Sequence, residues 1–301
     1  MLQSHVQLSN DVLAAREANQ PIVALESTLV SHGLPWPANL ETAREAESVV
    51  RAAGAVPATV AVIDGVVRVG LDRDDLERLA SGTDVFKASR RDLPWLVAQR
   101  RMGATTVAGT MFVAHLAGIP IMATGGIGGV HRGANETCDV SADLIELSRT
   151  PVAVVCSGAK SILDLPRTLE FLETHGVPVI GYGIDELPAF FATSSGLLLD
   201  NRVDTPVQAA EVIRAAKELH LSSGIVFANP PPREHAVPRG DLEQWIEPAV
   251  TSASAAGIRG KALTPYLLDQ VRKLGGERVL AANRALIVRN AQLAAQVALS
   301  L

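Results

Sequence analysis

The chain has 301 residues, of which 48% are hydrophobic and 20% charged, and its net charge is −5 at pH 7. These values are typical of a globular protein with an ample core, and no basic tract exceeds the pairs Arg90-Arg91 and Arg100-Arg101, so we expect no nucleic-acid partner. Residues 1–20 are polar and helix-like, and no apolar run is long enough to span a membrane. The two cysteines lack metal-ligand spacing and offer no disulfide framework. We therefore expect a cytoplasmic protein without a membrane partner.

Short apolar segments alternate with helical patterns along the chain. A helix is expected from Asn39 to Ala53, opening at Asn39, and residues 241–301 are expected to be helical. Strands are expected at residues 22–25, 59–63, 66–69, 105–108, 120–123, 152–156, 177–181, 197–199 and 225–228. Because these segments are continuously apolar, both faces of the sheet should be covered. The sequence predicts an α/β protein: a single three-layer α/β/α domain over residues 1–301 with a mostly parallel central sheet, whose strand ends are the first place to seek a ligand.

Lys160 follows a buried strand and a turn of small residues. Burial among apolar neighbours disfavours an ammonium ion, so the pKa of such a lysine is expected to fall. A lysine that is partly neutral can attack a carbonyl carbon and form a Schiff base. The competing interpretation is a lysine that pairs with a carboxylate or extends to solvent.

A glycine-dense loop at residues 123–133 directly follows another strand. Glycines let the backbone approach an anion closely, which favours a phosphate or sugar-phosphate loop over a plain tight turn. His131 and Arg132 add hydrogen-bonding groups to it. Asp139 and Asp143 follow, and they share one face if a helix begins there, as ligands for Mg²⁺ or Mn²⁺. Alternatively, Asp139 caps the helix and Asp143 is solvated.

Three further segments carry polar side chains suited to chemistry. Glu26 follows an apolar strand, where burial would raise the pKa of its carboxyl group and suit it to act as a general acid. Lys87 precedes a helix start and could hold an anionic oxygen, although either residue could equally form a structural ion pair. Asn283 and Asn290 lie seven residues apart on one helical face, where asparagine can hold a sugar, a phosphate or a neighbouring loop.

Six segments, in order along nearly the whole chain, together resemble the pseudouridine-5′-phosphate glycosidase family, also called pseudouridylate synthases. These segments are 24–28, 87–92, 123–134, 139–144, 156–164 and 283–287. Members of this family reversibly convert pseudouridine 5′-phosphate and water into uracil and ribose 5-phosphate with a divalent metal, typically Mn²⁺. The resemblance therefore implies this activity in nucleotide catabolism, a homotrimer and a three-layer α/β/α fold.

The resemblance also implies roles for individual residues. Lys160 corresponds to the nucleophile, Glu26 to the proton donor and Asp139 to the metal ligand. The residues implied in substrate binding are Lys87, Val107, Ser141, Ala142 and Asp143, together with Thr124, His131 and Asn283.

Two other functions are compatible with these segments. An aldolase-like lyase would use Lys160 and the glycine-dense loop on a sugar phosphate without recognising uracil. A non-catalytic regulator would bind ribose 5-phosphate without turnover, but the sequence has no recognisable DNA-binding module to support that function.

Overall fold

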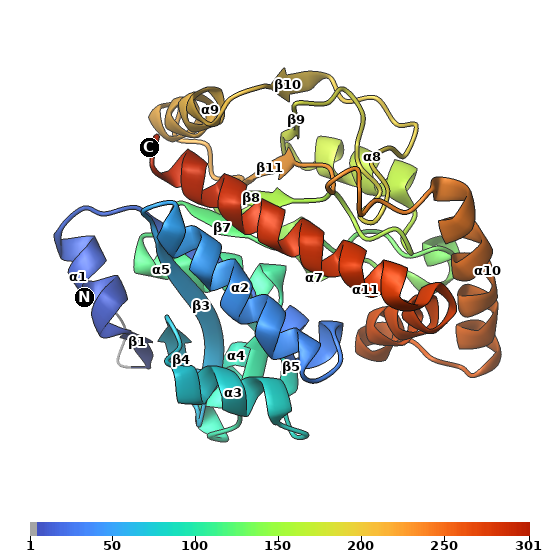
Figure 1. The fold of residues 1–301 in the computed structure, drawn as a ribbon, viewed down its shortest axis with the longest axis horizontal. Coiled ribbons are helices and arrows are strands. Elements are labelled where there is room, and N and C mark those ends of the chain that lie inside the picture. The colour runs from blue at the N-terminus through green and yellow to red at the C-terminus, as the bar shows by residue number, and fades with distance from the viewer. Residues whose placement is uncertain (1–4) are drawn as a thin grey trace.

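The computed structural model describes residues 5–301, whose strands form one eleven-stranded sheet (Figure 1). The main path of the sheet is β1-β4-β3-β2-β7-β8-β11-β9-β10, with β6 beside β3 and β5 beside β6. All pairs are parallel except β3 with β4 and β3 with β6. The strands are β1 (Val6–Leu8), β2 (Ile22–Leu25), β3 (Val56–Ile63), β4 (Val66–Val69), β5 (Phe86–Ala88), β6 (Gly103–Thr105), β7 (Ile121–Ala123), β8 (Ala153–Cys156), β9 (Val179–Tyr182), β10 (Asn201–Val203) and β11 (Ile225–Ala228).

Helices cover both faces of this sheet. On one face α2 packs on β3 while the long helix α11 crosses β2, β7 and β8, and α5 packs behind the sheet (Figure 1). The helices are α1 (Asn10–Glu17), α2 (Ala38–Ala52), α3 (Arg73–Ser81), α4 (Leu93–Ala98), α5 (Val107–Ala117), α6 (Ala134–Thr137), α7 (Ala142–Leu147), α8 (Leu165–Thr174), α9 (Pro206–Glu218), α10 (Arg239–Ala255) and α11 (Leu263–Ala298). The predicted three-layer α/β/α architecture with a mostly parallel sheet is confirmed.

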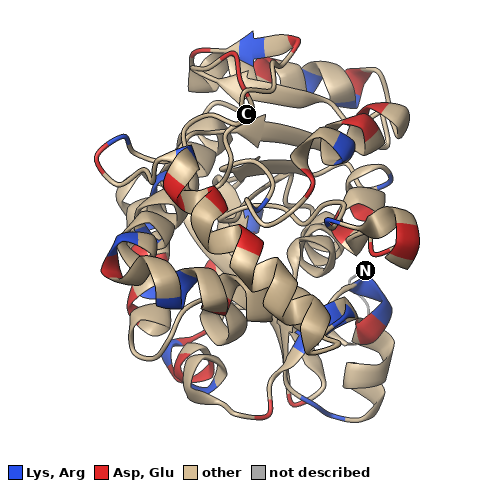
Figure 2. Ribbon diagram, turned by 90° about the vertical axis from the view of Figure 1, so that its right-hand side faces the viewer, with Lys and Arg blue, Asp and Glu red and all other residues tan. Residues whose placement is uncertain are grey.

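The central strands are buried along their whole length. Every residue of β2, β7, β8 and β11 is inaccessible to solvent or nearly so, because each strand has helices on both sides. Charged residues of both signs are mixed over the helices, while the strands at the centre of Figure 2 are almost free of charge. Within residues 5–301, every helix is too short or too polar to cross a bilayer.

Two of the predicted strands are misplaced. The strand predicted at 105–108 ends at Thr105, because the Thr106 side chain accepts a hydrogen bond from the Gly109 amide and thereby caps α5. The strand predicted at 197–199 is wrong. Leu198 is 76% exposed and forms only an isolated bridge to Glu186, and the regular strand β10 begins later.

The ends of the chain also differ in detail from the prediction. The helix-like N-terminal segment contains the short strand β1 before α1, and residues 1–4 of that segment lie outside the described residues. Helix α2 begins at Ala38. The side-chain Nδ2 of Asn39 donates hydrogen bonds to the carbonyls of Val30 and Ala80 instead of capping the helix. The C-terminal part is helical as predicted, with a break between α10 and α11 and a non-helical residue, Gly276, inside α11.

Candidate active site

A cavity of about 340 Å³ opens at the carboxyl ends of the central parallel strands. Segments that follow β2, β7 and β8 contribute to its wall, because these strands are neighbours in the sheet. The eleven residues to which the resemblance assigns a role all line this one cavity: Glu26, Lys87, Val107, Thr124, His131, Asp139, Ser141, Ala142, Asp143, Lys160 and Asn283. Arg132, which was expected beside His131 in the glycine-dense loop, does not line it, and its guanidinium pairs with Glu243 at 3.1 Å.

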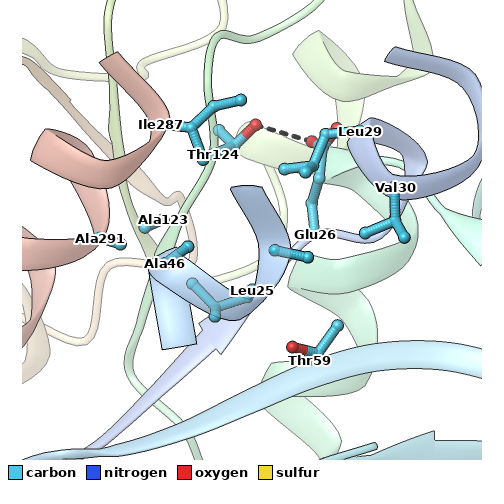
Figure 3. Close-up of a pocket in the computed structure, with 11 residues that line it drawn as sticks. Leu25, Glu26, Leu29, Val30, Ala46, Thr59, Ala123, Thr124, Ile287 and Ala291 are labelled. Atoms are coloured by element: carbon cyan, nitrogen blue, oxygen red, sulfur yellow. Dashed lines mark hydrogen bonds between the residues drawn. The ribbon is translucent and has the colours of Figure 1, made fainter. Parts of the chain in front are cut away.

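Glu26 lies directly after β2 and is 7% exposed. Figure 3 shows its carboxylate beside the Thr124 hydroxyl, which donates a hydrogen bond of 2.7 Å to Oε2. The same close-up shows Leu29 and Val30 near the acid. Together with Glu26 they line a small gap of about 10 Å³. Burial raises the pKa of Glu26, and the nearby Lys160 and the Thr124 hydrogen bond oppose that rise only in part. A buried acid with a raised pKa is suited to donate a proton.

Lys160 lies four residues beyond β8, in a loop held tightly against the rest of the protein. Gly158 has φ +76° and its α-carbon approaches the Pro188 carbonyl so closely that a Cβ would not fit. The Lys160 amide donates to the Ile127 carbonyl at 3.1 Å, and its side-chain Nζ donates to the Gly126 carbonyl at 2.6 Å. The amine is therefore half-buried at the cavity wall and oriented by the glycine-dense loop.

Asp143 connects that loop to helix α5. It is 6% exposed, and its two carboxylate oxygens accept hydrogen bonds from the backbone amides of Ala108 at 2.9 Å and Gly128 at 2.8 Å. A Cβ at residue 128 would lie 2.8 Å from Asp143 Oδ2, so glycine is needed for this close approach. Both oxygens are thus engaged by the protein itself.

The two carboxylates at 139 and 143 do not share a helix face. Helix α7 begins at Ala142 and Ser141 is its N-cap, so Asp139 precedes the helix and the prediction of a common face is wrong. The alternative, with Asp139 as cap and Asp143 solvated, is wrong on both points.

The glycine-dense loop is tied to its surroundings through several backbone amides. The amide of Ile127 donates to the Gly158 carbonyl at 3.1 Å, that of Gly128 to Asp143, and that of Val130 to the Thr168 hydroxyl at 3.0 Å. These three amides are engaged within the protein, so they are not the groups that would bind an anion. In this part of the loop the glycines serve close packing.

Lys87 extends from β5 into the same electrostatic environment. Burial lowers the pKa of Lys87, the charge of Lys160 lowers it further, and Asp143 and Glu26 act in the opposite direction. His131 also has a lowered pKa, mainly because of burial, although Asp139 opposes the shift. The cavity thus brings two lysines and two buried carboxyl groups within range of one another.

Asp139 and Asp143 differ in how their carboxylates are engaged. Both oxygens of Asp143 accept backbone hydrogen bonds, whereas the half-buried Asp139 carboxylate, near His131, has no hydrogen-bond or ion-pair partner among residues 5–301. No group of three or more His, Cys, Asp or Glu is arranged around a common point within residues 5–301. A single carboxylate such as that of Asp139 fits a hard divalent cation that keeps most of its water ligands and is bound through one or two carboxylates and the substrate.

The sequence did not point to several residues that line the cavity. Leu29 and His32 belong to a single π-helical turn, Leu29–Gly33, directly after Glu26. Lys261 lies in the turn between α10 and α11, and Thr264 lies in the first turn of α11; both are more than 100 residues beyond Lys160 in the chain. Local patterns gave no signal for these contacts, because they depend on how distant elements pack.

Comparison with known proteins supports a common origin over the whole chain. A family model described as indigoidine synthase A-like protein matches residues 11–300. Among curated relatives, a pseudouridine-5′-phosphate glycosidase of Herpetosiphon aurantiacus is 57% identical over 98% of this chain and 97% of the relative. Another from Caldanaerobacter subterraneus subsp. tengcongensis is 53% identical over 98% of this chain and 96% of the relative.

Solved structures agree with these matches. The prealnumycin C-glycosynthase AlnA in complex with ribulose 5-phosphate superposes with a TM-score of 0.90 at 37% identity, covering 99% of this chain and 98% of that one. An indigoidine synthase A-like protein of Thermotoga maritima has a TM-score of 0.89 at 32% identity, covering 98% and 95%. The chain belongs to the indigoidine synthase A-like family and, within it, to the pseudouridine-5′-phosphate glycosidases.

Proposed function

We propose that this chain is a pseudouridine-5′-phosphate glycosidase that reversibly cleaves pseudouridine 5′-phosphate with water to uracil and ribose 5-phosphate. One observation carries the proposal: a lysine amine and a buried acid with a raised pKa line the same cavity. Full-length relatives at about half identity are named for this activity, and AlnA is named for making a C-glycoside and holds a sugar phosphate.

The bond to be broken explains the need for an amine. Uracil is attached to ribose through carbon, so no glycosidic oxygen is available to be protonated and leave, and a pair of carboxylates alone is poorly suited. We infer that Glu26 gives its proton to the ring oxygen while the ribose opens and the Lys160 nitrogen bonds to C1′. The proton that the Lys160 nitrogen loses on bonding passes to the Glu26 carboxylate and from there to C5 of uracil. The nitrogen lone pair then forms the C1′ imine as the C1′–C5 bond breaks. Water then hydrolyses the imine to ribose 5-phosphate and frees the lysine.

The remaining cavity residues would bind and orient the substrate. Lys87 is suited to an anionic oxygen, and the α7 N-terminus at Ser141, Ala142 and Asp143 meets Val107 where α5 begins. The other proposed substrate contacts are Thr124, His131 and Asn283. We assign Asp139 as the ligand of a Mn²⁺ ion, which would supply a positive charge beside the substrate when bound. A cytoplasmic homotrimer remains part of the proposal.

Two measurements test this function directly. Incubation with pseudouridine 5′-phosphate and Mn²⁺ should release uracil, and incubation of uracil with ribose 5-phosphate should form the C-nucleotide. Borohydride added with ribose 5-phosphate should leave a stable adduct on the peptide that contains Lys160, and Lys160→Ala should remove both the adduct and the turnover. Trapping without any exchange of uracil would instead indicate a lyase acting on another sugar phosphate.

A further inference from the structure

Asn290 is a fully buried residue of α11 whose side chain joins three loops beneath the cavity. Its Nδ2 donates to the Thr124 carbonyl at 2.9 Å, to the Gly125 carbonyl at 3.3 Å and to the Ser157 hydroxyl at 3.1 Å. Its Oδ1 accepts a hydrogen bond of 2.9 Å from Asn229 Nδ2. These loops follow β7, β8 and β11, so one amide connects the ends of three strands.

The chemistry of this position requires an amide. Two carbonyl oxygens face the Nδ2 atom, and they can accept but not donate hydrogen bonds. The Asn229 amide on the other side is a donor and needs an acceptor. A side chain of the same shape without N–H groups would remove the donor to the buried Thr124 carbonyl, whereas the Gly125 carbonyl would keep the Ser157 amide.

The loop that Asn290 holds is also the loop that contacts Glu26 and Lys160. Thr124 is held by Asn290 at its carbonyl and donates its hydroxyl to Glu26. Two residues later, the Gly126 carbonyl accepts from the Lys160 amine. The Ser157 amide also donates to the Gly125 carbonyl at 2.9 Å, which fixes the start of the Lys160 loop against the same segment.

We propose that Asn290 is a positioning residue that sets the hydrogen bonds of both Glu26 and Lys160 by holding the backbone of Thr124 and Gly125. This inference rests on the proposed function only in naming Glu26 as the acid and Lys160 as the nucleophile. Asn290 itself does not line the cavity, whereas Asn283, seven residues earlier, does.

Asn290→Asp gives the sharpest perturbation because it keeps the shape and removes the amide donor. The Thr124 hydrogen bond favours the ionised form of Glu26, so losing its alignment raises the pKa of Glu26 further. The substitution replaces none of the other groups acting on Glu26, which are Lys160, Asp143 and Lys87, but it adds a carboxyl group. The neutral variant Asn290→Leu removes the same donor without adding a carboxyl group, and it should give the same upward shift. Because the charge of Lys160 lowers this pKa, a displaced Lys160 shifts it in the same direction. We expect an upward shift of about one pH unit in the Glu26 titration, as for loss of a hydrogen bond to a charged group.

The test is an NMR titration of the ¹³C-labelled Glu26 carboxyl group, assigned with Glu26→Gln, which needs no substrate. Thr124→Val removes the hydroxyl directly and should give an upward shift as well. Asn290→Leu added to Thr124→Val should give a smaller further shift than Asn290→Leu gives alone, because the Thr124 contribution is already lost. Val12→Ala truncates a buried side chain of α1, away from the cavity, and controls for loss of stability alone. It should leave the Glu26 titration unchanged.

Each outcome decides the matter. An unshifted Glu26 titration in folded Asn290→Asp, or equal shifts in Val12→Ala, would overturn the inference. If Asn290→Asp does not fold, Asn290→Ser keeps one donor and should show a smaller shift in the same direction. Failure of both variants to fold would make Asn290 a folding residue and refute the positioning role. Absence of uracil release by the wild-type chain would refute the proposed function but not the titration result.

Discussion

Replacing Asp143 by asparagine tests how the cavity wall is held together. The buried carboxylate accepts one backbone amide from each side, Ala108 at the start of α5 and Gly128 in the glycine-dense loop. Asparagine keeps one oxygen, but its NH₂ group must face the other amide, donor against donor. One charge-assisted hydrogen bond is therefore lost and one buried N–H is left unsatisfied.

The size of the effect follows from these contacts. A hydrogen bond to a charged group contributes roughly 1.5–3 kcal/mol, and a negative charge at the α5 N-terminus roughly 0.3–1 kcal/mol more. We therefore expect Asp143→Asn to lower the free energy of unfolding by about 2–4 kcal/mol, a large part of the total stability of a typical domain. Urea unfolding should show a lower midpoint with an unchanged slope.

A matched substitution separates the contact from the change of residue type. Asp72 is exposed and caps α3 by accepting from the Asp75 amide, a position where asparagine is about as effective. Asp72→Asn should therefore change the free energy of unfolding by less than about 0.5 kcal/mol. Equal stabilities for Asp143→Asn and the wild-type chain would refute the assignment of the two backbone hydrogen bonds.

Three further predictions concern catalysis. Glu26→Gln should lower kcat by about 10²–10⁴-fold with little change in KM. Because burial raises the pKa of Glu26, the wild-type enzyme should keep its acid protonated at low pH, and its rate should fall as pH rises through that pKa. A rate that increases there would contradict the acid role. Excess chelator should abolish uracil release and Mn²⁺ should restore it, with Asp139→Ala strongly impaired; full activity in chelator would remove the metal from the reaction. Lys160→Arg should give no borohydride adduct, since a guanidinium stays protonated, and an adduct on Lys87 instead would exchange the roles of the two lysines.

The sequence predicted the central strands well because each is buried on both faces and is therefore a continuous apolar run. It missed β1, β5 and β10, which have only three residues each and are partly exposed. The error at 197–199 has the opposite cause, since Leu198 belongs to an apolar run but is exposed. An apolar run is therefore a good indicator of a central strand, which is buried on both faces, and a poor indicator of an edge strand or an exposed loop.

The residues implied by the family resemblance come together in one cavity, but the local sequence did not reveal how their contacts differ. The difference between Asp139 and Asp143 depends on two backbone amides contributed by other segments, Ala108 and Gly128. The two helical asparagines are likewise equivalent in sequence, yet only Asn290 meets carbonyls more than 160 residues away in the chain. Such distinctions arise from tertiary contacts and have no local pattern.

The geometry implies that the acid and the amine are not tuned independently. β2, β7 and β8 are adjacent and parallel, so the segments that follow them meet at one edge, with residues 124–126 between the other two. Thr124 donates to Glu26 and Gly126 accepts from Lys160, so a shift of this short segment alters both partners together. In the proposed mechanism the first proton transfer and the attack on C1′ occur on the same sugar, so a shared support would keep the two groups in the required relative position. This coupling explains why a loop so close to the chemistry is fixed by buried hydrogen bonds to α11 rather than left mobile.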